Sequence, residues 1–344
     1  MSYPLREPPP EESATTPASV FANDAGLRPW WRLLLYLAIV LTPWLLMKLA
    51  EHMAVATAQP QVIQQLSPVV EGIEEWMQFG YIFFATWIMS RIEDRDVFDY
   101  GLQPARGSVR RGLLGAVWGL LCMSLLILML WSTHHLVFTG ILQHGAGAAL
   151  KGAAWAFTFI GVGLFEEFFF RGYLLYIVTL CFVDLLRRRF TRASSADTAA
   201  FWCAAVFISF AFGFVHSANP GESPIGLVCA GLAGLVFAFT LWRTGSLWWA
   251  IGFHAAWDWA QSFLFGVADS GGVSAGRLLS SRPQGSALMS GGSTGPEGSL
   301  FVLAIMLLIT LIVVTTLRRS GTPVSGTSVL PWPHMEKDLA PEVH

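Results

Sequence analysis

Charged side chains are scarce in this chain of 344 residues. Lys, Arg, Asp and Glu together make up 13% of it, whereas hydrophobic residues make up 54%. This scarcity excludes an ordinary soluble globular protein, in which about 25% of residues are charged. The formal net charge is −2, and no basic stretch is interleaved with aromatic residues, which excludes nucleic acid as an expected partner. The composition therefore indicates an integral membrane protein.

Cysteine is also sparse. The four cysteines, Cys122, Cys181, Cys203 and Cys229, stand singly inside apolar blocks, and no CxxC or CxxH spacing occurs. This excludes a zinc finger and favours small buried hydrophobic residues. The HExxH motif of zinc proteases is absent as well.

The apolar residues that dominate the chain are gathered into blocks of the length that a helix needs to cross a bilayer, about 20 residues. Only helices satisfy their own backbone hydrogen bonds within such a segment. We therefore predict an all-α, polytopic transmembrane helical bundle of about eight spans. The blocks are 30–50, 70–90, 113–136, 149–170 with an amphipathic extension to 189, 199–215, 225–242, 247–265 and 300–317.

The blocks and the stretches between them predict a division of the chain. Its parts are a disordered cytoplasmic tail (1–29), three accessory helices (30–140), a four-helix core (149–265), a flexible loop (266–299), a last helix (300–319) and a disordered tail (320–344). The loop has 17 Gly or Ser among its 34 residues. The first tail lacks a basic n-region and a small-residue cleavage site, so we expect the first span to be retained.

Small residues in two of the blocks predict close contacts between helices. Gly115 and Gly119 form a GxxxG motif, and Gly226, Ala230 and Gly234 form a stripe of small residues at the same spacing.

Lysine and arginine predict the orientation, because cytoplasmic loops carry an excess of both. With both termini in the cytoplasm, sixteen basic residues lie on the cytoplasmic side and four outside. The sixteen are Arg6, Arg28, Arg32, Arg91, Arg95, Arg106, Arg110, Arg111, Arg187, Arg188, Arg189, Arg192, Arg243, Arg318, Arg319 and Lys337; the four are Lys48, Lys151, Arg277 and Arg282. We expect a protein of the bacterial cytoplasmic membrane, in contact with lipid.

Three ionisable residues interrupt the apolar segment GVGLFEEFFFRGYLLY. A charge at mid-membrane costs at least about 2.5–3.5 kcal/mol, so Glu166, Glu167 and Arg171 require a reason. Glu167 and Arg171 are four residues apart, on one helix face and in the order that favours an ion pair. Glu166 points about 100° away and has no partner on its helix. It is therefore a candidate general base, although a purely structural Glu–Arg pair that locks two helices is an open alternative.

More polar groups occur in the following blocks. His216 ends the block 199–215 in the sequence FGFVHSANP, and His254 and Asp258 are four residues apart in GFHAAWDW, on one helix face. Two histidines, an aspartate and a glutamate pair on three helices favour a shared site over separate structural roles.

These residues resemble the CAAX prenyl endopeptidase and bacteriocin-processing enzyme (CPBP or Abi) family. Its motifs EExxxR, FxxxH and HxxxN or HxxxD occur here in order, at Glu166 to Arg171, Phe212 to His216 and His254 to Asp258. The resemblance covers residues 150–265.

The resemblance implies an intramembrane endopeptidase that activates a water molecule and cleaves a membrane-associated or lipidated substrate. It implies that Glu166 is the general base, that His216 helps hold and deprotonate the water, and that Arg171 orients Glu167. His254 and Asp258 would stabilise the oxyanion. Prenyl proteases of the family usually have asparagine at the last position, so Asp258 counts against prenyl specificity.

Other functions stay open at this point. Glu166, His216, His254 and Asp258 also suit a divalent metal such as zinc, although the family is regarded as independent of metal, so we expect no cofactor. A transporter would place similar residues at mid-membrane, and a scaffold or immunity protein could retain the motifs without turnover. No internal repeat supports transport.

Overall fold

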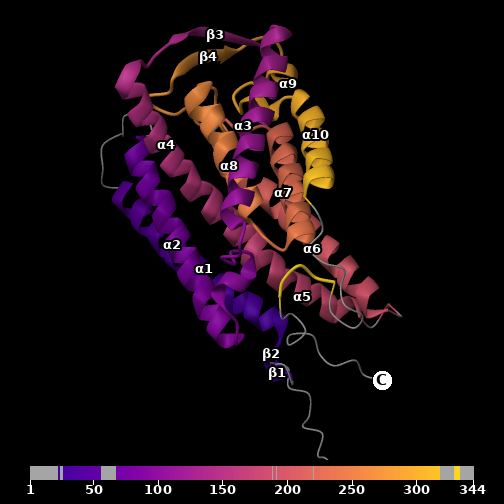
Figure 1. Cartoon of the computed structure of the whole chain (residues 1–344). Coiled ribbons are helices and arrows are strands. Elements are labelled where there is room, and N and C mark those ends of the chain that lie inside the picture. The colour runs from indigo at the N-terminus through magenta and orange to yellow at the C-terminus, as the bar shows by residue number, and fades with distance from the viewer. Residues whose placement is uncertain are drawn as a thin grey trace, which may run out of the picture.

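The computed structural model describes residues 22–23, 26–55, 67–187, 189–190, 192–219, 221–317 and 329–333. Within them the chain is mainly helical, as predicted (Figure 1). The long helices are α1 (Pro29–Val55), α2 (Pro68–Ile92), α3 (Ser108–Ser132), α4 (Gly145–Glu166), α5 (Leu175–Leu186), α6 (Ala193–Val215), α7 (Pro224–Thr244), α8 (Trp248–Asp258) and α10 (Phe301–Thr316). Most of the predicted tails lies outside the described residues, as do Arg6, Arg188, Arg318, Arg319 and Lys337.

Four helices in the described part of the chain are long and apolar enough to cross a membrane. They are Ser108–Ser132, Gly145–Leu186, Ala193–Ala218 and Pro224–Thr244, and two shorter apolar helices span Pro29–Pro43 and Phe301–Thr316. An all-helical protein with several apolar helices is thus confirmed, whereas the number of eight spans stays a prediction.

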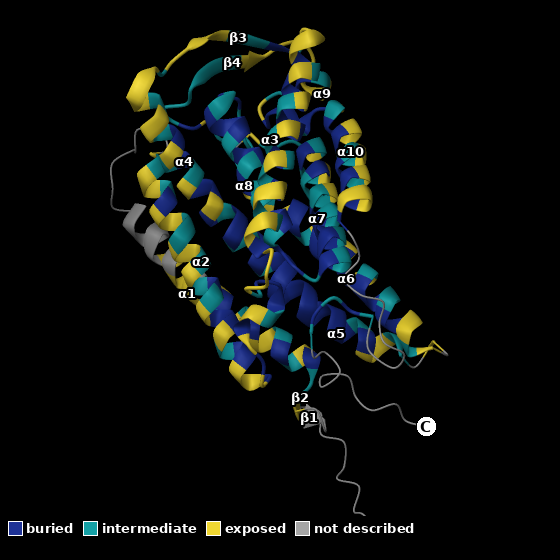
Figure 2. Ribbon diagram, in the orientation of Figure 1, coloured by how far each residue is buried: buried dark blue, intermediate teal, exposed yellow. Residues whose placement is uncertain are grey.

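Exposed residues lie along several helices (Figure 2), and many of them are large and apolar. Phe210 of α6 is 71% exposed and Leu307 of α10 is 74% exposed, and Leu113 of α3 is exposed too. Extended apolar faces of this kind would be unfavourable in water, whereas they suit contact with lipid tails. The surface therefore agrees with an integral membrane protein.

One helical rod runs through the protein from Gly145 to Leu186, where the sequence predicts a span with an extension. It begins as α4, continues through a π-helical segment, η2 (Glu167–Leu174), and ends as α5. A second π-helical segment, η4 (Trp259–Leu264), follows α8. Such segments contain more residues per turn than an α-helix and occur often at functional sites. Here, one begins directly after Glu166 and the other directly after Asp258.

The predicted GxxxG motif brings α3 and α8 into close contact. A Cβ atom at Gly115 would lie 2.1 Å from the carbonyl oxygen of Trp249, and one at Gly119 would lie 2.2 Å from that of Phe253. Only glycine allows the two backbones to approach so closely. The motif thus fixes the helix that carries His254.

Replacing Gly119 with alanine is expected to lower the free energy of unfolding by about 1–3 kcal/mol, because the added methyl group forces α3 and α8 apart. Chemical unfolding in mixed micelles measures this change. Gly80→Ala on α2 is the matched control, since a Cβ there meets nothing within 4 Å. It should be neutral or slightly stabilising. Equal losses in the two variants would contradict the proposed backbone contact.

The segment 266–299, predicted to be a flexible loop, contains short structural elements that the prediction missed. Strand β4 (Leu279–Pro283) pairs antiparallel with β3 (Leu136–Ile141), and helix α9 (Ala287–Ser290) and the 3-10 turn η5 (Pro296–Gly298) follow. The β3–β4 ribbon and α9 lie together at one end of the helical bundle (Figure 1). The segment therefore forms a cover over that end of the bundle.

Candidate active site

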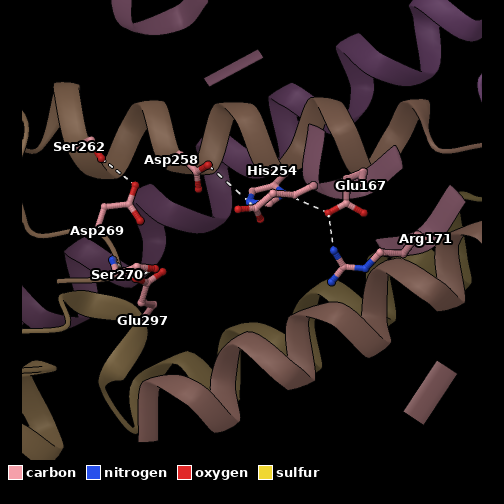
Figure 3. A network of polar contacts seen from close by, with 9 residues as sticks. Glu167, Arg171, His254, Asp258, Ser262, Asp269, Ser270 and Glu297 are labelled. Carbon is pink, nitrogen blue, oxygen red and sulfur yellow. Dashed lines mark hydrogen bonds and ion pairs between the residues drawn. The ribbon is translucent and has the colours of Figure 1, made fainter. Parts of the chain in front are cut away.

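The fully buried carboxylate of Glu167 holds two of the predicted site residues together (Figure 3). Its Oε1 atom accepts hydrogen bonds from Arg171 Nη1 at 3.1 Å and from His254 Nδ1 at 3.0 Å. The predicted ion pair between positions i and i+4 is therefore present, and it also reaches α8. Because Nδ1 donates to Glu167, the orientation of the imidazole ring is fixed.

The other ring nitrogen of His254 lies between two further carboxylates. His254 Nε2 is 3.7 Å from Glu166 Oε2 and 3.5 Å from Asp258 Oδ2. Glu166 Oε2 is enclosed and accepts no hydrogen bond from the described residues. The two neighbouring glutamates thus differ in their surroundings, since Glu167 Oε1 accepts two hydrogen bonds, although Glu167 Oε2, like Glu166 Oε2, accepts none from the described residues.

Arg171 is buried beside an aromatic ring and a glycine. Its guanidinium carbon lies 3.9 Å from the centre of the Phe212 ring, close enough for a cation–π interaction. A Cβ atom at Gly234 would lie 2.7 Å from Arg171 Nη2, so the absence of a side chain there provides space for the guanidinium. The phenylalanine of the FxxxH motif and one glycine of the small-residue stripe therefore hold the arginine in place.

The π-helical segment is also anchored on its other side. Tyr173 donates a hydrogen bond to Glu93 Oε1 at 2.7 Å, and Tyr100 donates to the other oxygen of the same carboxylate. Tyr36 packs on Tyr173 with ring centres 4.2 Å apart. These contacts join the segment that carries Glu167 to α1 and α2, the accessory helices.

His216 comes from a different helix, and its Nε2 atom makes no hydrogen bond to the described residues. It opens a 3-10 turn after α6, and its Nδ1 donates to the carbonyl oxygen of Phe212 at 2.7 Å. A neutral ring in this tautomer presents an unprotonated Nε2, which can accept a hydrogen bond.

A cavity of about 200 Å³ brings four of the six predicted site residues together. Its lining includes Glu166, His216, His254 and Asp258. Glu167 and Arg171 do not line the cavity and lie behind His254. The remaining wall is mostly apolar. Its apolar residues are Phe159, Val162, Phe212, Cys229, Ala230, Ala233, Val236, Phe237, Phe253, Trp257, Met306 and Ile309.

Sequence reasoning missed the polar residues at the other end of this cavity. Asn219, Asp269, Ser270 and Glu297 line it, and the last three come from the segment 266–299. Asp269 accepts a hydrogen bond from Ser262 Oγ at 2.8 Å, and Glu297 accepts one from Ser270 Oγ at 3.2 Å (Figure 3). No motif or regular spacing marks these residues, so only the folded chain reveals them.

Burial changes the acidity of both carboxyl groups. It raises the pKa of Asp269 to about 6, and burial together with the negative charge of Asp269 raises the pKa of Glu297 to about 8. The folded protein therefore holds the proton on Glu297 to a higher pH than the unfolded chain does. Consequently the free energy of unfolding falls as pH rises from about 4.5 through 8.

Replacing Glu297 with glutamine is expected to remove the loss of stability at high pH. The glutamine side chain keeps an oxygen that accepts a hydrogen bond from Ser270. The Tm of the variant should match that of the parent at pH 5 and exceed it by about 2 °C or more at pH 8. Thermal unfolding in detergent at the two pH values measures the difference. Asp269→Asn should act in the same direction, but between about pH 4 and pH 6. An equal Tm difference at both pH values would contradict the raised pKa of Glu297.

The arrangement of His, Cys, Asp and Glu side chains bears on the alternative of a metal centre. In the described part of the chain, no group of three or more His, Cys, Asp or Glu side chains is arranged to hold a metal ion. Glu166 and Asp258 both approach His254 Nε2, and His216 makes its hydrogen bond to a backbone carbonyl.

Comparison with known proteins identifies the segment that carries these motifs. Residues 148–260 match the family model described as Type II CAAX prenyl endopeptidase Rce1-like. No curated protein and no solved structure matches the chain. The matched segment contains the six predicted site residues, whereas α1 to α3, the segment 266–299 and α10 lie outside it.

Proposed function

We propose that the chain is an intramembrane endopeptidase, because residues 148–260 match the model of the Rce1-like type II CAAX prenyl endopeptidase family, a family of peptidases. It would hydrolyse a peptide bond of a membrane-associated or lipidated protein by means of a water molecule that Glu166 and His216 activate. The observation that supports this most directly is that these two side chains, from different helices, line one cavity of about 200 Å³.

Glu166 is the group best placed to be the general base. Its Oε2 atom accepts no hydrogen bond from the described residues, so the carboxylate is free to accept a proton from water. His216 Nε2 would accept a second hydrogen bond from the same water. The hydroxide attacks the scissile carbonyl carbon, and Glu166 then returns the proton to the leaving amine as the C–N bond breaks.

His254 would stabilise the tetrahedral oxyanion. A protonated ring, with Nδ1 donating to Glu167, leaves Nε2–H facing the cavity beside Glu166 and Asp258. A preorganised donor of this kind contributes about 3–4 kcal/mol to transition-state stabilisation in a site shielded from water. Asp258 would keep the ring oriented and charged, and Glu167 with Arg171 would position it from behind.

The membrane supplies the substrate in this proposal. The apolar wall of the cavity and the exposed apolar faces of the helices suit a substrate that is itself held by lipid. An aspartate at position 258, in place of the usual asparagine, favours a substrate without a prenyl group. We propose that the protein resides in a bacterial cytoplasmic membrane with both termini in the cytoplasm.

The test is cleavage of a peptide library, prenylated and not, by the protein purified in detergent. The parent is expected to cleave, and His216→Ala is expected to lose the activity. Metal chelators should have no effect. Loss of the parent's cleavage on chelation, restored by zinc, would contradict water activation by Glu166 and His216 alone. Absence of cleavage together with ion flux in vesicles would instead indicate a transporter.

A further inference from the structure

The basic side chains of the described residues are concentrated at one end of the bundle. This end holds β2, the end of α2, the start of α3, the α5–α6 connection and the end of α7, and it lies opposite the β3–β4 ribbon (Figure 1). Its arginines are Arg28, Arg32, Arg91, Arg95, Arg106, Arg110, Arg111, Arg187, Arg189, Arg192 and Arg243. At the ribbon end the described basic residues are Lys151, Arg277 and Arg282. By the positive-inside rule, the ribbon end faces away from the cytoplasm.

The cavity lies toward the ribbon end. Its lining residues on α6 and α8 come from the second half of each helix, and those on α7 from the first two thirds, which are the portions nearer to this end. Asn219 comes from the α6–α7 connection, and Asp269, Ser270 and Glu297 come from the segment 266–299. Among the described residues, none that lines the cavity belongs to α5 or to the α7–α8 turn at the arginine-rich end.

Hydrogen bonds join the segment 266–299 to the α6–α7 connection and also link residues within this segment. Ser293 Oγ donates to the carbonyl oxygen of Gly221 at 2.7 Å, and the Gly271 amide donates to Thr294 O at 3.1 Å. Within the same segment, Ser270 Oγ donates to Glu297 Oε1 at 3.2 Å. Asp269, Ser270 and Glu297 line the cavity and are all partly exposed, which suits an opening at this end.

We propose that the cavity opens to the extracytoplasmic face, through a mouth formed by Asn219, Asp269, Ser270 and Glu297. This inference rests on the proposed function only for the identity of the ligand. It assigns the substrate to one class, membrane-associated proteins whose cleaved segment lies on the extracytoplasmic side. The arginine-rich end would have no direct path to Glu166.

A cysteine placed in the cavity tests the proposal without any need for catalysis. Ala233→Cys is introduced into a variant whose four native cysteines are replaced by alanine, and Ala230→Cys serves as a second position if the first fails to fold. Both alanines line the cavity. The probe is the small, membrane-impermeant, cationic reagent trimethylammonium-ethyl methanethiosulfonate. It is applied to sealed right-side-out and inside-out membrane vesicles.

The cavity cysteine is expected to be modified fully in right-side-out vesicles and not in inside-out vesicles. Ser293→Cys, exposed near the mouth, should behave in the same way, and Arg106→Cys, exposed at the arginine-rich end, in the opposite way. Modification of the cavity cysteine only in inside-out vesicles, or in neither preparation, would overturn the proposal. Reversed behaviour of the two exposed controls would overturn it as well. Failure of the peptide-library assay leaves this result unaffected, so the two proposals fail separately.

Discussion

Replacing Glu166 with glutamine is expected to lower kcat/KM for peptide cleavage by about 10³-fold. Glutamine has nearly the same shape, but its amide cannot accept a proton from water at neutral pH. Glu166 Oε2 accepts no hydrogen bond from the described residues, and its contact with His254 Nε2 is long, at 3.7 Å, so the substitution breaks no hydrogen bond of this oxygen. The Tm should therefore stay close to that of the parent while activity is lost.

Cleavage of a peptide selected from the library, followed over several substrate concentrations, measures this effect. Glu74→Gln is the matched control, since this carboxylate is exposed on α2 and lies outside the cavity lining. It is expected to retain the kcat/KM of the parent. Retention of more than about a tenth of the activity by Glu166→Gln would remove Glu166 from the role of general base.

The arrangement around Glu167 shows how far spacing alone predicts a site. The four-residue spacing of Glu167 and Arg171 predicts an ion pair, and the structure contains it. The motif order on successive helices predicts that Glu166, His216, His254 and Asp258 meet, and all four line one cavity. Periodicity brings residues of one motif to a common face of a helical segment, whereas the meeting of the three motifs is what the family resemblance implies.

Contacts that depend on the packing between helices could not be predicted in this way. No feature of the sequence indicates that Gly234 provides space for Arg171, since small residues suit any close helix contact. The sequence also does not predict the hydrogen bonds of Asp269 and Glu297. The Gly- and Ser-rich composition around them indicates a flexible chain and not a defined backbone. The π-helical segments were missed too, since an extra residue in a helical turn leaves no compositional mark.

The number of membrane spans depends on whether each helix faces lipid or other helices. α2 carries Glu71, Glu74 and Glu75 and is not among the helices apolar enough to cross a membrane by itself, although the hydropathy of 70–90 predicts a span. α8 has only 11 residues before the π-helical segment begins. Both helices pack closely against α4, so their environment is partly protein and partly lipid. Hydropathy alone does not separate the two environments.

The buried pair of Arg171 and Glu167 yields the second large effect. Arg171→Met keeps most of the side-chain volume but removes the positive charge, which leaves Glu167, a fully buried carboxylate, with His254 as its remaining hydrogen-bond donor. Breaking a buried pair by removal of one partner costs about 3–5 kcal/mol, because the other charge stays buried without compensation. The free energy of unfolding should fall by that amount.

The double variant Glu167→Gln/Arg171→Met separates this effect from a simple loss of packing. Without either charge, no uncompensated ion remains, so the double variant is expected to be more stable than Arg171→Met by at least about 1 kcal/mol. Chemical unfolding in mixed micelles measures all variants, with the exposed Arg106→Met as a control that should change stability by less than about 0.5 kcal/mol. If the double variant is as unstable as the sum of the two single variants, then Arg171 stabilises the site through packing on Phe212 and not through the charge of Glu167. In that case Glu167 would depend on His254 alone, and the positioning role assigned to Arg171 would be lost.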